Sequence, residues 1–261
     1  MRFRSAGHLA FAAVMITLGI QGLITRDFTA VWQPVPKGLP AREGLIGLCA
    51  LVSLAAGMGL LWKRTAPIAA RVLLAYLTLW WLLFRVREIL RAPSAFPAWD
   101  GCAETTVMVA AAWVLYAWFA ADSDGRRIGF AAAENGFRLA RVLYGLAMIP
   151  FGLAQFIYLK ETASLVPAWL PAHTAWAEFT GGAFLAAGAA VLTGIGARLA
   201  AALSALQIGL FTLLVWVPIV AAGSRDASQW SEFVLSIALT AGAWVVADSY
   251  RGMPWVAAGK R

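Results

Sequence analysis

Eight long apolar segments separated by short polar stretches make up most of the chain. A helix needs about 20 mostly apolar residues to cross the hydrocarbon core of a bilayer, and each segment comes near that length. We therefore predict an all-α membrane protein with eight transmembrane helices, at residues 8–24, 43–62, 67–90, 102–121, 139–158, 174–193, 197–221 and 230–247. One markedly polar connection divides them into two sets of four. This predicts a first unit at residues 1–121, a cytoplasmic linker at 122–138, a second unit at 139–248 and a basic tail at 249–261.

The two halves share a sequence pattern. The hexapeptides "VPKGLP" at 35–40 and "VPAWLP" at 166–171 lie 131 positions apart. The same offset aligns "LAAG" at 54–57 with 185–188, Trp99 with Trp230, and "AWV" at 112–114 with 243–245. Upstream the alignment slips by about three residues, because Gln21 then matches Gln155. We interpret the chain as a tandem duplication.

Each unit has an even number of helices, so both units start on the same side of the membrane. We predict two parallel four-helix repeats related by an approximate two-fold axis along the membrane normal. The repeat also matches the first apolar segment to the fifth, which favours a retained helix over the alternative of a cleaved signal peptide. Because proline disfavours helix in the residue before it, each hexapeptide is expected to interrupt the chain before the second helix of its unit.

Composition agrees with a membrane protein. Hydrophobic residues make up 61% of the chain and charged residues 13%, whereas soluble domains have about 45–50% apolar residues. The net charge of +8 comes from Lys and Arg that lie mainly at the ends of apolar segments, where they contact lipid headgroups. We therefore expect the lipid bilayer as partner and no nucleic acid. Cys49 and Cys102 have no CxxC spacing, so we expect buried thiols and no metal site.

The distribution of basic residues predicts an orientation. Thirteen of the 21 Lys and Arg residues lie on the face that holds both termini, and eight lie on the other face. Because cytoplasmic loops carry more Lys and Arg, both termini are predicted to be cytoplasmic in a multi-pass protein of the bacterial inner (plasma) membrane. The two hexapeptides then lie on the outer face.

Charged groups inside a bilayer are costly, so each one is a candidate site. Glu178 lies about 9 Å into the sixth segment, and Gly181 and Gly182 beside it favour close helix packing. Arg85 lies at a similar depth in the third segment, within "LLFRVREILR". Glu88 is three positions from Arg85, so an ion pair along the helix is possible. Arg87 and Arg91 are interpreted as headgroup contacts.

We predict that Glu178 and Arg85 meet between the two halves, either as a structural ion pair or as the polar floor of an outward-facing pocket. Gln155 and Glu232 are candidates for lining the same space. His173 is interpreted as an interfacial cap rather than a metal ligand, because its spacing from Glu178 places the two about 140° apart around a helix. Asp100 and Glu104 share a helix face, but Asp100 is expected at the solvated boundary.

The second half resembles the DoxX family of small four-helix bacterial membrane proteins. The resemblance is carried by "VPAWLPAHTAWAEFTGGAFLAAGAAVLTGIGARLAA", in which the matching positions are Glu178, Gly181, Gly182, Gly188, Gly194 and Arg198. It covers most of residues 139–248 and extends weakly to the first half, where Gly47 stands in place of the glutamate. It implies a fused tandem of two DoxX-like units.

The resemblance leaves three functions open, since relatives include a subunit of a thiosulfate:quinone oxidoreductase and proteins of unknown activity. The first is a non-catalytic subunit or scaffold of a membrane complex, with other membrane subunits as partners. The second is a component of a quinone-linked oxidoreductase, with a quinone headgroup beside Glu178 and Arg85. The third is a transporter of a small solute or lipid.

Overall fold

The computed structural model describes residues 5–36, 38–120 and 133–257, and within these ranges the chain forms helices joined by short turns, with no strand. Eight helical spans are long and apolar enough to cross a membrane. The first unit contains α1 (Ala6–Thr25), η1 (Ala30–Trp32), α2 (Arg42–Leu61), α3 (Ala66–Trp80), η2 (Trp81–Val86), α4 (Arg87–Arg91) and α5 (Phe96–Ala120). The second contains α6 (Ala133–Ile157), α7 (Leu159–Leu165), α8 (His173–Thr193), α9 (Ala197–Phe211), η3 (Thr212–Trp216), α10 (Val217–Ala221) and α11 (Ala227–Asp248). The prediction of an all-helical chain with eight apolar spans is confirmed.

Helices α5 and α6 each start six residues earlier than predicted. α6 begins at Ala133, so residues 133–138 of the predicted linker are helical, and linker residues 122–132 lie outside the described residues. α5 begins at Phe96 rather than at residue 102. Pro97 is compatible with this start, because the first N–H groups of a helix have no partner within the helix. The earlier start places Asp100 inside α5 rather than at its boundary.

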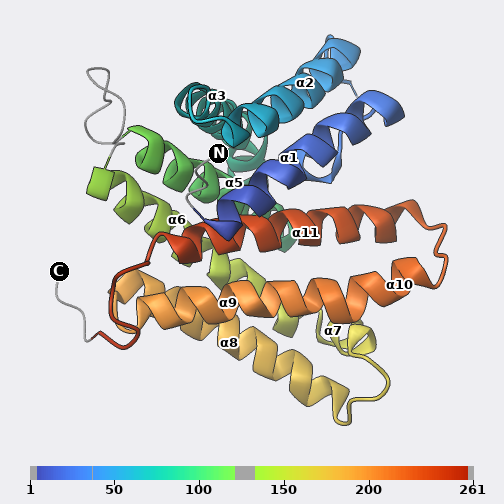
Figure 1. The fold of residues 1–261 in the computed structure, drawn as a ribbon. Coiled ribbons are helices and arrows are strands. Elements are labelled where there is room, and N and C mark those ends of the chain that lie inside the picture. Colours follow the sequence, from blue (N-terminus) through green and yellow to red (C-terminus); the bar gives the residue numbers. More distant parts are fainter. Residues whose placement is uncertain (1–4, 37, 121–132, 258–261) are drawn as a thin grey trace.

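Helix α5 is the central helix of the fold. It packs against α3, α6 and α11, and α11 also packs against α1, so these contacts join the two units (Figure 1). In an apolar stretch of 18 residues within α5, 83% is buried inside the protein. The corresponding share is at most 50% in any other membrane-spanning helix. Polar groups on α5 therefore face the protein interior rather than lipid.

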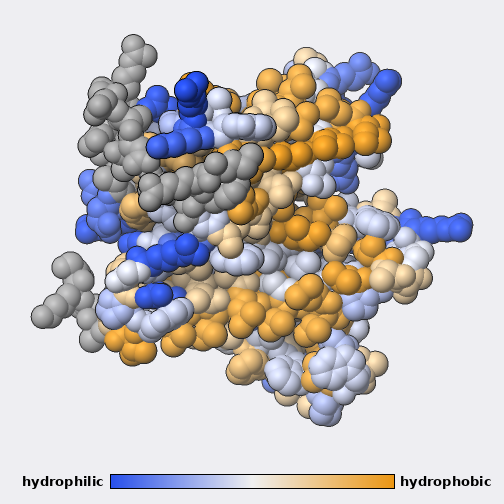
Figure 2. All heavy atoms as spheres, viewed as in Figure 1, coloured by the Kyte–Doolittle hydropathy of each residue, from blue (hydrophilic) through white to orange (hydrophobic). Residues whose placement is uncertain are grey.

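The protein has two polar faces at opposite ends of the helices. We call the face with the turns at residues 26–41, 92–95, 158–172 and 222–226 the distal face, and the face on which α1 begins and α11 ends the terminal face. In Figure 2 hydrophilic residues gather at these two edges and hydrophobic residues cover the helices between them. This pattern is that of a chain in a lipid bilayer. That the terminal face is cytoplasmic stays a prediction.

Matched positions of the two units have similar backbone features. The π-helical segments η2 and η3 interrupt the third helix of each unit and begin at residues 81 and 212, which are 131 positions apart. Ala41 and Ala172, also 131 apart, are the residues before α2 and α8, and each has a φ of 55°. In both units the chain thus enters the second helix through a left-handed residue directly after the hexapeptide.

Two tryptophan hydrogen bonds follow the same offset. Trp99 Nε1 donates to the Pro93 carbonyl at 2.9 Å, and Trp230 Nε1 donates to the Ser224 carbonyl at 2.9 Å. Each bond joins the start of the last helix of a unit to the turn before it. The tryptophans that aligned in the sequence therefore have the same structural role.

The ends of α1, α6 and α11 are connected at the terminal face. Asp248 accepts a hydrogen bond from the Gly7 N–H at 3.2 Å, and Arg141 of α6 donates to Ser249. The Arg141 guanidinium also lies 4.2 Å from the centroid of the Tyr250 ring. Burial raises the pKa of Tyr250 to about 12, so Arg141 meets a neutral ring.

Gly181 and Gly182 provide a test of the close packing of α6 and α8. A Cβ atom on Gly181 would lie 2.9 Å from Gln155 Cβ and 3.1 Å from the Gly152 carbonyl oxygen, whereas a Cβ on Gly182 would meet nothing within 4 Å. We expect Gly181→Ala to lower the free energy of unfolding by about 1–3 kcal/mol through overpacking. Gly182→Ala should leave it unchanged or raise it by up to about 1 kcal/mol, because alanine favours helix. Unfolding in detergent micelles, followed by circular dichroism, measures both, and equal losses would contradict the packing.

Candidate functional site

A cavity of about 180 Å³ lies among α5, α6, α8, α9, η3 and α11, near the distal face. Its wall carries three carboxylates, from Asp100, Glu104 and Glu232, and we call it the acidic cavity. Gln155 and Ser236 add further polar groups. The cavity thus combines side chains of the central helix of the first unit with those of the whole second unit.

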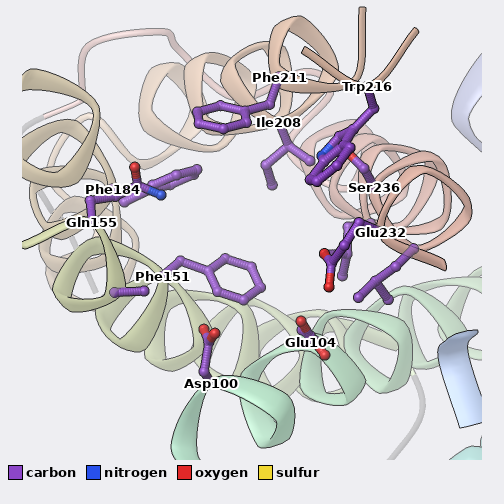
Figure 3. A pocket seen from close by; sticks show the side chains of 13 residues that line it. Asp100, Glu104, Phe151, Gln155, Phe184, Ile208, Phe211, Trp216, Glu232 and Ser236 are labelled. Atoms are coloured by element: carbon purple, nitrogen blue, oxygen red, sulfur yellow. The ribbon is translucent and has the colours of Figure 1, made fainter. Parts of the chain in front are cut away.

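The three carboxylates point into the same space (Figure 3). Asp100 and Glu104 are one turn apart on α5, and Glu232 lies on α11. At 1.5 Å per residue, Glu104 lies about 12 Å inside the start of α5, whereas Glu232 is exposed at the mouth. No hydrogen bond or ion pair of these three carboxylates occurs within the described ranges. The three carboxyl groups are close enough to interact electrostatically, and Glu104 interacts with both of the others.

Aromatic rings form much of the remaining wall. Phe151 and Phe184 meet edge to face with their ring centroids 6.0 Å apart, and Phe211 and Trp216 line the cavity from α9 and η3. No Lys or Arg is among the described residues that line it. Carboxylates attract positive charge, and ring faces attract it as well. The cavity therefore has the chemistry of a site for a cation.

A metal ion fits this cavity poorly. Within the part of the chain that the structure describes, no three His, Cys, Asp or Glu residues are close enough together to hold one. The three carboxylates lie on one side of the cavity, and aromatic rings line much of the rest (Figure 3). An organic cation suits such a wall better than a bare ion.

Arg85 lies beside the acidic cavity but not in it. It is 2% exposed, and its Nε donates to Thr105 Oγ1 on α5 at 3.1 Å. A Cβ atom on Gly101 would be 3.6 Å from Arg85 Nη1, so the guanidinium lies closely against α5. Glu104 and Glu88 are the acidic groups whose charges act on it. Arg85 therefore supplies a positive charge next to the carboxylates, from the π-helical segment η2.

The predicted contact between Arg85 and Glu178 does not form, and no ion pair joins them among the described residues. Arg85 is buried against α5, whereas Glu178 is exposed on α8. The face of α8 that packs against α6 contains Ala177 and Gly181. Glu178 follows Ala177 and is therefore turned about 100° away from that face.

The other predicted site residues fall into two groups. Gln155 and Glu232 line the acidic cavity. Glu88 is exposed on α4, and His173 begins α8 in a half-buried position. Neither of these two lines the cavity. The structure thus has a pocket near the distal face, and its lining includes Asp100 and Glu104 of α5 but neither Glu178 nor Arg85.

Sequence analysis underestimated Asp100 and Glu104. Their spacing of four residues was visible, but a helix predicted to start at residue 102 left Asp100 in solvent. With α5 beginning at Phe96, both carboxylates lie on one face of a buried helix. Phe211, Trp216 and Ser236 gave no signal in an apolar sequence, because apolar and hydroxyl residues occur on every face of such helices.

In the first unit, a buried tryptophan packs on the residue that aligns with Phe211 in the sequence. Trp32 of η1 is 1% exposed, and its ring centroid lies 5.3 Å from that of Trp80 and 5.4 Å from that of Tyr76. Trp80 Nε1 also donates to the Trp32 carbonyl at 3.2 Å. Trp80 is 131 positions before Phe211, which lines the acidic cavity. The loop between α1 and α2 thus places the Trp32 ring against Trp80. The loop between α6 and α8 contributes no residue to the lining of the acidic cavity.

Comparison of the chain with protein-family models, with curated proteins and with solved structures finds no match. The function is therefore argued from the geometry of the acidic cavity.

A double-mutant cycle tests the placement of Arg85. We expect the effects of Arg85→Gln and Glu178→Gln on the free energy of unfolding to add within about 0.5 kcal/mol, because the two residues share no partner. Arg85→Gln with Thr105→Val should show a coupling of about 0.5–3 kcal/mol, because these side chains are hydrogen-bonded. Unfolding of all five variants in one detergent supplies the values. A coupling of Arg85 to Glu178 as large as that to Thr105 would contradict the structure.

Proposed function

We propose that this protein is a multi-pass membrane protein that binds a small organic cation of the ammonium type in the acidic cavity. The observation that carries the proposal is the convergence of Asp100, Glu104 and Glu232 on one cavity whose other walls are mainly aromatic. Ionisable residues within membrane-spanning segments commonly mark the paths and sites of substrates. Asp100 and Glu104 lie in the first turns of α5, so the binding site lies near the distal face.

Electrostatics favour an occupied cavity. Three carboxylates that face one another in a medium of low dielectric repel strongly, and Arg85 offsets this only from behind α5. A cation at the centre would be attracted by all three. Phe151 and Phe211 would contact its apolar substituents, while Gln155 and Ser236 offer hydrogen-bond acceptors for any N–H group.

The proposal predicts binding of tetramethylammonium by the purified protein. Glu104→Gln and Glu232→Gln should each weaken binding by about tenfold or more, since a loss of about 1.4 kcal/mol of charge attraction corresponds to tenfold. Equilibrium dialysis with radiolabelled tetramethylammonium measures the binding by each variant. Glu178→Gln is the matched control, because Glu178 is a carboxylate outside the cavity, and its binding should equal that of the wild type. Absence of binding by the wild-type protein, or equal losses in Glu178→Gln and Glu104→Gln, would overturn the proposal.

The tandem duplication and the DoxX-like resemblance belong to the same proposal. Support for the duplication comes from the equal spacing of η2 and η3, of Ala41 and Ala172, and of the two tryptophan hydrogen bonds. Packing also favours a slip of two residues rather than three, relative to the offset of 131, in the alignment of the first helices of the two units. A Cβ on Gly19 would meet Leu54 and one on Gly152 would meet Leu185, and these glycines are 133 positions apart.

The functions that the resemblance implies make different predictions for the same variants. A scaffold predicts that Glu104→Gln and Glu232→Gln change stability or assembly while no cation binds. A quinone-linked component predicts a quinone in the purified protein. Transport is favoured by hydroxyl groups that continue from the cavity, since Thr212 Oγ1 lies 2.6 Å from Ser236 Oγ and 3.0 Å from Thr240 Oγ1. Uptake of the labelled cation into proteoliposomes separates transport from binding alone.

A further inference from the structure

A second, apolar space borders the acidic cavity. It is a groove of about 430 Å³ between α7, α8, α9 and η3, and we call it the apolar groove. It is lined by uncharged side chains, with Trp169, Trp176 and Leu206 among the exposed ones. Between Leu203 and Leu214 it follows about 16 Å of helix at 1.5 Å per residue. These positions belong to membrane-spanning helices, so the groove opens to lipid.

The acidic cavity and the apolar groove share a thin wall. Phe211 lines both of them. Beside it, Thr180 of the groove donates to Gln155 of the cavity at 3.4 Å, and Gln207 donates to the Thr180 carbonyl at 2.9 Å. Phe211, Thr180 and Gln155 therefore lie where the carboxylate-lined space adjoins the apolar groove.

From this juxtaposition we infer that the ligand is a cationic amphiphile, with its ammonium head in the acidic cavity and its apolar tail in the apolar groove. The inference rests on the proposed function, because it assigns the tail of the same ligand. The charged head is assigned to the acidic cavity because the described residues of its wall include three carboxylates, whereas those of the groove wall include no charged group. The ligand is then drawn from the membrane between α8 and α9. Phe211 is the side chain that its tail passes.

Lipid tails fill any groove that faces a bilayer, so the test has to depend on the head group. The probe is a long-chain primary amine with a photoreactive diazirine in its tail, and the control probe is the neutral alcohol with the same tail. Both are added at equal mole fraction to the full-length protein in lipid nanodiscs. After illumination, mass spectrometry quantifies labelling of peptides from residues 162–183 and 203–215.

We expect the amine to label these peptides about ten times more than the alcohol, a ratio that corresponds to about 1.4 kcal/mol of head-group binding. Excess tetramethylammonium should abolish the difference by occupying the cavity. Ala183→Trp, which fills the groove, should remove the excess labelling and leave tetramethylammonium binding unchanged. Ala186→Trp, on an exposed position one turn further along α8, should change neither.

The outcomes separate this inference from the proposed function. If the wild-type protein binds no tetramethylammonium, the proposed function fails and this inference with it. If tetramethylammonium binds but amine and alcohol label the groove equally, the function stands and the tail assignment is wrong. If Ala183→Trp and Ala186→Trp reduce the labelling equally, the groove does not hold the tail.

Discussion

Helix α5 is enclosed by other helices over most of its length, so a polar group on it is costly unless it finds a partner inside the protein. Thr106 donates to the Cys102 carbonyl at 2.7 Å, and Thr105 accepts a hydrogen bond from Arg85. Asp100 and Glu104 have no comparable partner and face a cavity instead. An ionised carboxylate in an apolar interior is stable only near positive charge or water. The polar side chains of α5 need partners or water, and this need accounts for the burial of Arg85 and for the open space in the second unit.

Sequence analysis predicted the number of spans, because apolar length alone determines whether a helix can cross a bilayer. It also found the equivalent positions at which both units have the same backbone, such as Ala41 and Ala172, because proline patterns are local. It placed Glu232 and Gln155 near a pocket on the distal face. It failed for Glu178 and Arg85, since the rotation of a helix about its own axis depends on which small residues its neighbour meets. Gly181 faces α6, and this turns Glu178 outward.

The two units differ most in the loop between their first and second helices. In the first unit this loop carries Trp32, whose ring packs on Trp80 beneath the distal face. In the second it forms α7, which packs against α8 and leaves the space before Phe211 empty of side chains. A single ring carried by this loop therefore marks a clear difference between the two units. The carboxylates occur where the cavity stays open, and Arg85 occupies the position that matches Trp216 of the cavity wall.

The depth of the carboxylates favours a ligand from the bilayer over one from water. Asp100 and Glu104 lie about 6 and 12 Å inside the start of α5, which is long and apolar enough to cross a membrane. A water-soluble cation has to lose its hydration before it reaches Glu104, whereas the head of a membrane amphiphile moves sideways within the bilayer. Glu232 and Glu104 face the cavity from α11 and α5, so both attract the charged head once it is inside. The tail does not need to leave hydrocarbon, because the groove beyond Phe211 is apolar along its length.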